Sequence, residues 1–326
     1  MYLNNIFYMK SKMNNKKKTE IKSNKKIKIH LILPGGGVRG SYQGGFLYVL
    51  MNFFSECFEF VKIDSTSVGA LNGTGLCLGM YKDLKDFWLN FNSINDIFNS
   101  HSNIPLIGTL VNAYSSYYNM GLTKNIKLEK YIEEFFEKAT QNELDKIDIV
   151  VTNLSSSRYE YINGATDNFK SYLKASASPW ILTKPTVISN VSYTDGALLQ
   201  QFPLKNIGNI NCDFIMIVGV DSEYFKYMYS DIGNNLFNYI NKVLDVLYLQ
   251  CNLNDYMKIM DLENKKLFNS KVYVAKYNLD FSPLDFNQLN INIGLNQGKI
   301  EALKFILENI DLKKFYKPSS YLNIDF

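Results

Sequence analysis

The stretch IDSTSVGALNG, residues 63–73, holds two serines where an apolar segment passes into one rich in small residues. A serine in a tight strand-to-helix turn can act as a nucleophile when small side chains lie two residues before and after it. Ser67 has Ser65 and Gly69 at these positions, whereas Ser65 would have Ile63 and Ser67. Because an isoleucine would crowd the turn, we expect Ser67 to be the nucleophile, supported by Ser65 and Gly69. The motif alone is also compatible with Ser67 as an ordinary helix N-cap.

A serine nucleophile needs a base, and the chain has two histidines, His30 and His101. His30 precedes the turn on the first predicted strand, whereas reactive groups of an α/β sheet gather beyond the carboxyl ends of its strands. His101 lies in a polar stretch typical of a surface loop. We therefore expect a carboxylate base, Asp195, which Gly196 follows in a predicted loop, although an Asp-Gly pair alone is an ordinary turn signal. Desolvation would raise its pKa from about 3.9 and make it a better base.

A glycine loop, PGGGVRG at residues 34–40, lies between a predicted strand and a predicted helix. Such a loop presents backbone N–H groups to an anion, either a pyrophosphate or the oxyanion of a tetrahedral intermediate. It matches the dinucleotide-binding pattern GxGxxG from Gly35 to Gly40, and Asp64 lies near where a ribose-binding acid is expected. The loop alone is therefore compatible with nucleotide binding, with oxyanion stabilisation, or with a tight turn that binds no ligand. Arg39, one of only two arginines, could brace the loop or bind an anion.

The elements that must position these residues alternate between strand and helix. Hydrophobic periodicity predicts strands at 26–33, 58–64, 147–153, 159–163, 213–221 and 271–277. It predicts helices at 41–54, 67–81, 83–98, 127–139, 168–178 and 299–310, with one long or two short helices over 232–264. This order predicts an α/β layered fold with a largely parallel sheet.

Composition bounds the class of protein. The chain has 326 residues, 46% of them hydrophobic, which is enough for one large domain or two modest ones. No apolar run approaches the ~20 residues of a membrane-spanning helix. Nine of the 35 basic residues lie in residues 1–29 with one acid, which leaves 26 basic against 30 acidic residues in the remainder. We expect residues 1–29 to form a disordered, solvated basic tail, or alternatively a patch for anionic lipid headgroups. The mildly acidic remainder gives no support for nucleic-acid binding.

The four cysteines, Cys57, Cys77, Cys212 and Cys251, are widely spaced. Their spacing predicts neither a metal site nor a disulfide framework. We expect buried or partly buried reduced thiols in a cytoplasmic protein.

Four stretches together resemble the patatin-like phospholipase family: PGGGVRG with SYQGGFL, then STSVGALNG, KASASPW and TDGALLQQFPL, in that order over about residues 30–205. The resemblance implies a three-layer α/β/α fold with a largely parallel central sheet, in which residues 30–220 form the catalytic core and 221–326 a helical and strand extension of the same domain. It implies hydrolysis of lipid acyl esters through a Ser-Asp dyad and an acyl-enzyme, with no metal or other cofactor.

By position, the resemblance assigns Ser67 as the nucleophile and Asp195 as the base, with Gly196 in support. It places the oxyanion site in the glycine loop, at Gly35, Gly36, Gly37, Arg39 and Gly40. Within that set, the N–H groups of Gly36 and Gly37 are expected to donate and Arg39 to brace the loop.

The resemblance also implies a lipid substrate and contact with a membrane surface, and it leaves the oligomeric state open. A nucleotide-dependent oxidoreductase is a weaker interpretation, because it leaves the serine turn and the Asp-Gly element unexplained. The remaining alternative is a catalytically weak or inactive lipid-binding protein of the same fold.

Overall fold

The structure is a computed structural model. It describes residues 25–81, 83–91, 93, 126–179, 183–223, 236–263, 265–267, 269–283 and 285–315. His101 and residues 1–24 lie outside this part of the chain, so the expectations for them stay untested. The first strand begins at Ile27, inside the range expected for the basic tail, because its residues already pair with the neighbouring strand at Phe58.

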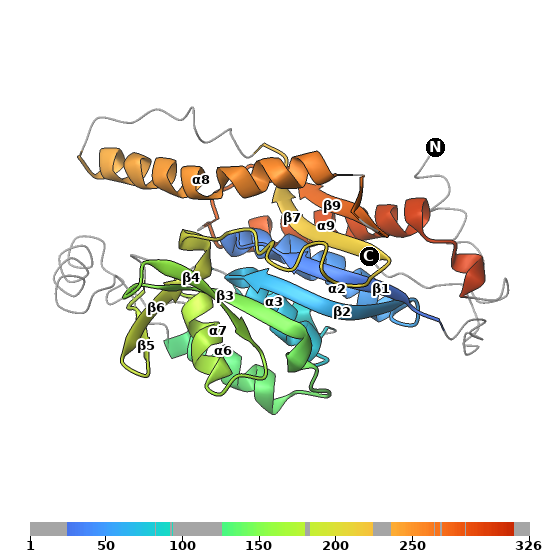
Figure 1. The fold of residues 1–326 in the computed structure, drawn as a ribbon, viewed down its shortest axis with the longest axis horizontal. Coiled ribbons are helices and arrows are strands. Elements are labelled where there is room, and N and C mark those ends of the chain that lie inside the picture. The colour runs from blue at the N-terminus through green and yellow to red at the C-terminus, as the bar shows by residue number, and fades with distance from the viewer. Residues whose placement is uncertain are drawn as a thin grey trace.

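A mixed sheet runs through the molecule (Figure 1). Its strands are β1 Ile27–Leu33, β2 Phe58–Thr66, β3 Ile147–Asn153, β4 Arg158–Asn163, β5 Thr186–Ile188, β6 Val191–Asp195, β7 Phe214–Asp221, β8 Lys266–Leu267 and β9 Ser270–Tyr277. They lie in the order β5-β6-β3-β2-β1-β7-β9-β8, and β4 pairs with β3 outside this path. The central strands β3, β2, β1, β7 and β9 are parallel, whereas the pairs at the edges are antiparallel.

Helices cover both faces of the sheet. They are α2 Gly40–Phe54, α3 Val68–Cys77, α4 Asp83–Leu89, α6 Ile126–Glu137, α7 Phe169–Ser176, α8 Leu236–Leu262 and α9 Gln288–Asn309, with short 3-10 turns η1 Gly37–Arg39, η3 Leu144–Lys146, η4 Gly196–Leu198 and η6 Leu312–Lys314. Along β1, Ile29, Leu31 and Leu33 enter the larger apolar core with α2, α3 and α9, whereas Ile32 enters a smaller core under α8. This alternation confirms the layered α/β fold with a parallel centre.

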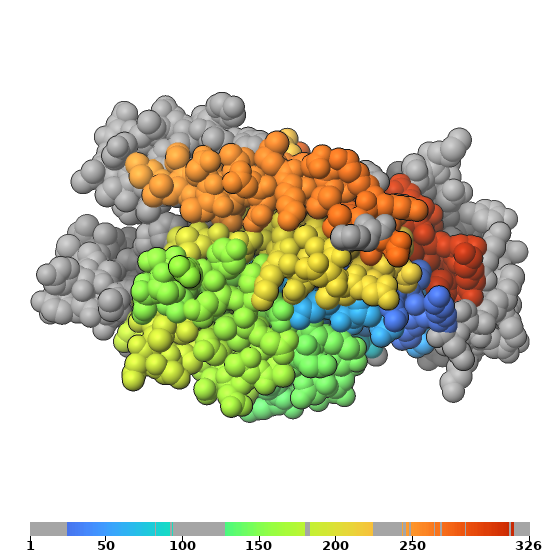
Figure 2. Space-filling view, in the orientation of Figure 1, coloured from blue at the N-terminus to red at the C-terminus, as the bar shows by residue number. Residues whose placement is uncertain are grey.

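The smaller core joins α8 to the segment that follows β6. Phe202 and Leu204 of that segment pack with Tyr256 and Ile259 of α8. In Figure 2 this segment and β7 (yellow) lie directly against α8 (orange). The segment therefore connects the end of β6 to the α8 layer of the fold.

Strands β2 and β6 meet end to end along one edge of β3. Thr66 of β2 pairs with Val150, and Asp195 of β6 pairs with the next residue, Val151. Val150 and Val151 also pair with β4, so β2 and β6 must share the opposite edge of β3. Because β2 is parallel to β3 and β6 is antiparallel to it, the two strands run toward each other and end at the same point.

The sequence interpretation was wrong about the segment around Asp195. We expected a loop there, whereas Asp195 is the last residue of β6, which forms a hairpin with β5. Runs of three to five residues carry too few alternations for a strand to be recognised. Cys251 also differs from expectation, since it is exposed while the other three cysteines are buried.

Helix α9 begins at Gln288 rather than at Lys299. Glycines inside its first half hid its periodicity, and they are required by its close crossing with α2. A Cβ on Gly298 would lie 1.9 Å from the carbonyl oxygen of Tyr42, and one on Gly294 would lie 2.0 Å from Ser41 Oγ. Small residues thus let the two backbones approach each other.

Candidate active site

Ser67 and Asp195 are in direct contact. Ser67 Oγ donates a hydrogen bond to Asp195 Oδ2 over 2.6 Å, and both side chains are buried. Ser67 precedes α3, but its side chain makes no capping bond to that helix. The hydroxyl is therefore directed at the carboxylate, which disfavours Ser67 as an ordinary N-cap.

The backbone at Ser67 is strained in the manner of a nucleophile elbow. Its φ of 56° and ψ of −126° are rarely adopted by residues other than glycine. Gly69 makes this turn possible, because a Cβ there would lie 2.2 Å from the carbonyl oxygen of Leu33. Ser65 is fully buried and its hydroxyl donates to the backbone oxygen of Asp148 over 3.3 Å, so it bonds to β3 rather than to Ser67.

Burial raises the pKa of the Asp195 carboxyl. Desolvation raises its pKa to about 7, against the lowering effects of the Ser67 hydroxyl and the N–H of Ala197. Asp195 Oδ1 accepts from Ala197 N over 2.8 Å, while Oδ2 faces Ser67. A carboxylate with a pKa near 7 is a far better proton acceptor than one at about 3.9.

Gly196 permits the chain to turn away directly after Asp195. A Cβ there would lie 2.3 Å from the carbonyl oxygen of Val150 on β3. The carbonyl of Asp195 is fixed by the hydroxyl of Thr152, 2.9 Å away. Contacts with β3 thus hold both sides of the Asp-Gly peptide.

The glycine loop lies close to Ser67 and to Ala197, which follows the Asp-Gly pair. A Cβ on Gly35 would lie 3.1 Å from the Cβ of Ser67 and 3.0 Å from that of Ala197. Gly35 N donates to Gln201 O, and Arg39 N donates to Gly36 O. Gly40 N donates to carbonyls within the loop. Three of the five amides in the expected oxyanion set are therefore already engaged.

The amides of Gly36 and Gly37 differ from the rest of the loop. Within the described residues, neither donates a hydrogen bond to another backbone group. Gly37 adopts a φ of 58° and a Cβ there would lie 2.1 Å from Pro283 O, so only glycine fits. Gly37 also lines a pocket together with Ser67. Of the five amides in the expected oxyanion set, these two are therefore the ones without a backbone acceptor.

The guanidinium of Arg39 braces the loop rather than facing Ser67. It donates to Asp221 Oδ2 at the end of β7 over 2.9 Å and to the carbonyl of Phe281. It also lies over the ring of Tyr277, 5.7 Å from its centroid. Arg39 is almost fully buried. The planar guanidinium makes these bonds and the ring contact from one fixed fork of donors, a geometry that lysine lacks.

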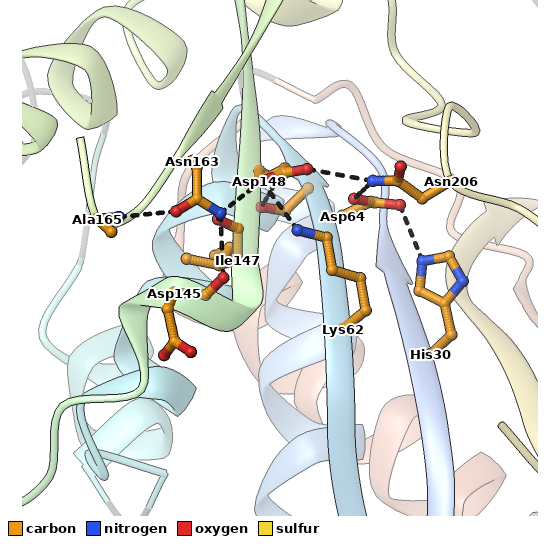
Figure 3. A network of polar contacts seen from close by, with 10 residues as sticks. His30, Lys62, Asp64, Asp145, Ile147, Asp148, Asn163, Ala165 and Asn206 are labelled. Carbon is orange, nitrogen blue, oxygen red and sulfur yellow. Dashed lines mark hydrogen bonds and ion pairs between the residues drawn. The ribbon is translucent and has the colours of Figure 1, made fainter. Parts of the chain in front are cut away.

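His30, the one histidine in the described part of the chain, belongs to a separate polar network (Figure 3). Its Nε2 lies 2.8 Å from Asp64 Oδ2, and Asn206 donates to the other oxygen of Asp64 and to Asp148. His30 pairs with Lys62, five residues before Ser67, so roughly 16 Å of strand separates it from the serine. Asp64 is fully buried with both oxygens bonded, so it does not fit as a ribose-binding acid.

The described residues contain no group of three or more His, Cys, Asp or Glu side chains that could hold a metal ion.

The sequence model of patatin-like phospholipases matches residues 31–206, more than half of the 326 residues. The chain belongs to the patatin-like phospholipase family. The match spans the glycine loop, the serine elbow and the Asp-Gly element. No curated protein sequence matches the chain. Among solved structures, it is similar to VipD from Legionella pneumophila at 12% identity, with a TM-score of 0.47 over 92% of this chain and 72% of that one.

An apolar pocket opens beside the serine of this patatin-like domain. It is lined by aromatic and aliphatic side chains from α3, α4, α6 and the loops beside them: Val68, Leu71, Phe87, Trp88, Phe91, Leu128, Tyr131, Ala177, Pro179 and Phe286, together with Gly37 and Ser67. Such a lining suits a hydrocarbon chain more than a polar group.

The sequence interpretation missed the role of Ser176 at the end of α7. Ser176 Oγ accepts from Ser67 N over 3.0 Å and donates to Val150 O. Two residues on, the carbonyl of Ser178 accepts from Asp195 N. The KASAS stretch thus fixes both patatin-like candidate residues. The sequence signal was the alternation of small residues before Pro179. That alternation does not indicate that Ser67 and Asp195 are the residues contacted.

No helix in the described ranges is long and apolar enough to cross a membrane.

Proposed function

We propose that the protein is a lipid acyl hydrolase that cleaves fatty-acyl esters through Ser67 and Asp195. The observation that carries this proposal is the 2.6 Å hydrogen bond from Ser67 Oγ to Asp195 Oδ2 at a strained elbow beside an apolar pocket. A nucleophile and a base in hydrogen-bond contact are the minimum that acyl transfer requires. The family match supports the same reaction class.

Acylation begins when Ser67 Oγ attacks the ester carbonyl carbon and its proton passes to Asp195 Oδ2. The bond from Oγ to carbon forms as the carbonyl π electrons move onto oxygen. Collapse of this intermediate breaks the bond to the leaving alcohol, and Asp195 returns the proton to that oxygen. The products are a free alcohol and an acyl ester on Ser67.

Deacylation repeats these steps with water. Asp195 takes a proton from water as its oxygen attacks the acyl carbon, and then returns the proton to Ser67 Oγ as the fatty acid leaves. In both halves, the N–H groups of Gly36 and Gly37 stabilise the oxyanion. The loss of one such donor costs about 2.7–4 kcal/mol of barrier in other acyl-transfer enzymes.

The substrate class follows from the pocket. Its lining between α3, α4 and α6 would hold the acyl chain, with the ester at Ser67. The leaving headgroup lies outside this pocket in the proposal, so its identity is open. We expect the enzyme to act as a cytoplasmic protein at the surface of a membrane, because its substrate resides there.

Hydrolysis of a panel of phospholipids, galactolipids and glycerides tests this function. Wild type is expected to release fatty acid, Ser67→Ala to release none above background, and Ser65→Ala, its matched control, to keep activity. Release of fatty acid by Ser67→Ala would contradict the proposal. Binding of lipid by the wild type without any hydrolysis would favour the inactive lipid-binding alternative.

A further inference from the structure

Gln201, which lies beyond the residues of the proposed dyad and oxyanion site, bonds both sides of Gly35. Its carbonyl oxygen accepts from Gly35 N over 3.2 Å, and its side-chain Nε2 donates to Gly35 O over 3.1 Å. Gln201 is buried, and it follows η4 on the segment that leaves Asp195. One residue thus fixes the two peptide planes that meet at Gly35.

The second of these planes includes the N–H of Gly36. The carbonyl of Gly35 and the N–H of Gly36 belong to the same trans peptide and point in opposite directions. A hydrogen bond that holds the carbonyl toward Gln201 therefore also aims the Gly36 N–H. Donation to the carbonyl additionally polarises the peptide and strengthens its N–H as a donor.

Gln201 is itself held from α8. Its backbone N donates to Asn252 Oδ1 over 2.6 Å. Asn252 is fully buried beside an apolar cluster that includes Tyr256 and Ile259. Burial of an amide among apolar side chains is costly unless it is hydrogen-bonded. The bond to Gln201 N therefore gives a reason for an asparagine at this buried position.

We propose that Gln201, anchored by Asn252, is a positioning residue that orients the Gly36 N–H toward the oxyanion. This inference rests on the proposed acyl hydrolysis. Since the oxyanion is absent from the bound substrate and develops only as the tetrahedral intermediate forms, the pair acts on kcat and leaves KM nearly unchanged.

Gln201→Met tests the side-chain bond, because methionine keeps the length and loses the donor. We expect kcat to fall by about 10–100-fold, less than the loss of an oxyanion donor, with KM within about threefold. The matched control is Gln200→Met. Its side-chain amide donates to Asp255 and to the carbonyl of Phe202, not to Gly35, so kcat should remain within about threefold.

Asn252→Ala tests the anchor. Because Asn252 acts through Gln201, the losses should be less than additive: in the Gln201→Met background only the backbone bond from Gly35 N to the residue 201 carbonyl is left for Asn252 to hold. Additive losses would contradict a shared route to Gly35. A kcat for Gln201→Met within threefold of wild type, or an equal loss in Gln200→Met, would overturn the proposal.

Hydrogen exchange of the peptide spanning residues 34–40 separates this inference from the hydrolase proposal. Gln201→Met should accelerate exchange there more than Gln200→Met does. Equal exchange in the two variants would overturn the positioning role even if wild type hydrolyses lipids. Absence of Ser67-dependent hydrolysis in wild type would instead contradict the proposed function.

Discussion

Ser67 and Asp195 meet at the point where two strands running in opposite directions end on the same edge of β3. Thr66 and Asp195 pair with the adjacent residues Val150 and Val151. The chain past the end of β2 then brings Ser67 Oγ to 2.6 Å from the carboxylate. The sheet register thus explains how two residues 128 positions apart in the sequence come into contact.

The strain at Ser67 predicts a difference between two inactive variants. Ser67→Ala and Ser67→Gly both lose the hydroxyl, but only glycine relaxes a φ of 56° with a ψ of −126°. We expect Ser67→Gly to unfold with a free energy about 1 kcal/mol higher than Ser67→Ala. Chemical denaturation of both variants measures it, and greater stability of the alanine variant would argue against a strained elbow.

The pH dependence of hydrolysis should report Asp195. Burial raises its pKa to about 7, and the carboxylate must be ionised to take the proton of Ser67. We therefore expect kcat/KM to rise about tenfold per pH unit below pH 7 and to level off above it. A profile that is flat between pH 5 and pH 8, measured on a soluble ester, would exclude this carboxylate as the base.

The same raised pKa predicts that the ionised carboxylate of Asp195 lowers the free energy of unfolding. The folded state binds this proton more tightly than the unfolded chain, whose aspartates titrate near 3.9, so stability falls as pH rises from about 4 to about 7. Asp195→Asn removes the titration. Its melting temperature should exceed that of wild type at pH 8 and the advantage should shrink toward pH 4, while kcat falls by about 10²–10⁴-fold. An equal advantage at both pH values would show that no raised pKa is involved.

Ser65 and Gly69, two residues before and after the proposed nucleophile, should respond differently to substitution. Gly69→Ala places a Cβ 2.2 Å from Leu33 O, and backbone cannot give way, so we expect a loss of about 1–3 kcal/mol and of activity. Ser65→Gly removes a hydroxyl that bonds to Asp148 O, away from Ser67, so kcat should stay within about threefold. A large rise in kcat for Ser65→Gly would show instead that this hydroxyl tightens the elbow.

Much of the site was predictable from sequence because its geometry depends on local sterics. The need for small residues around Ser67 follows from the turn itself, and Gly69 shows the close backbone contact that enforces it. With only two histidines in the chain, the composition favours a carboxylate as the base. In the structure, His30 is bound to Asp64, and Asp195 contacts Ser67.

What could not be predicted depends on partners far away in the sequence. The N–H of Gly35 donates to Gln201, 166 residues away, and is therefore not free for an oxyanion. The glycine pattern of the loop does not reveal this distant partner. The partners of Arg39, Asp221 and Phe281, are also distant in the sequence and could not be predicted from the loop itself. The start of α9 was hidden because Gly294 and Gly298 serve its contact with α2 rather than its helical propensity.

Covalent labelling with a fluorophosphonate probe, followed by peptide mapping, tests the central claim most directly. Wild type is expected to carry one phosphonyl adduct, on Ser67 in the peptide containing STSVGALNG, and Ser65→Ala to label at the same position. Ser67→Ala should not label. An adduct on Ser65 or on any residue other than Ser67, or labelling that persists in Ser67→Ala, would contradict the account.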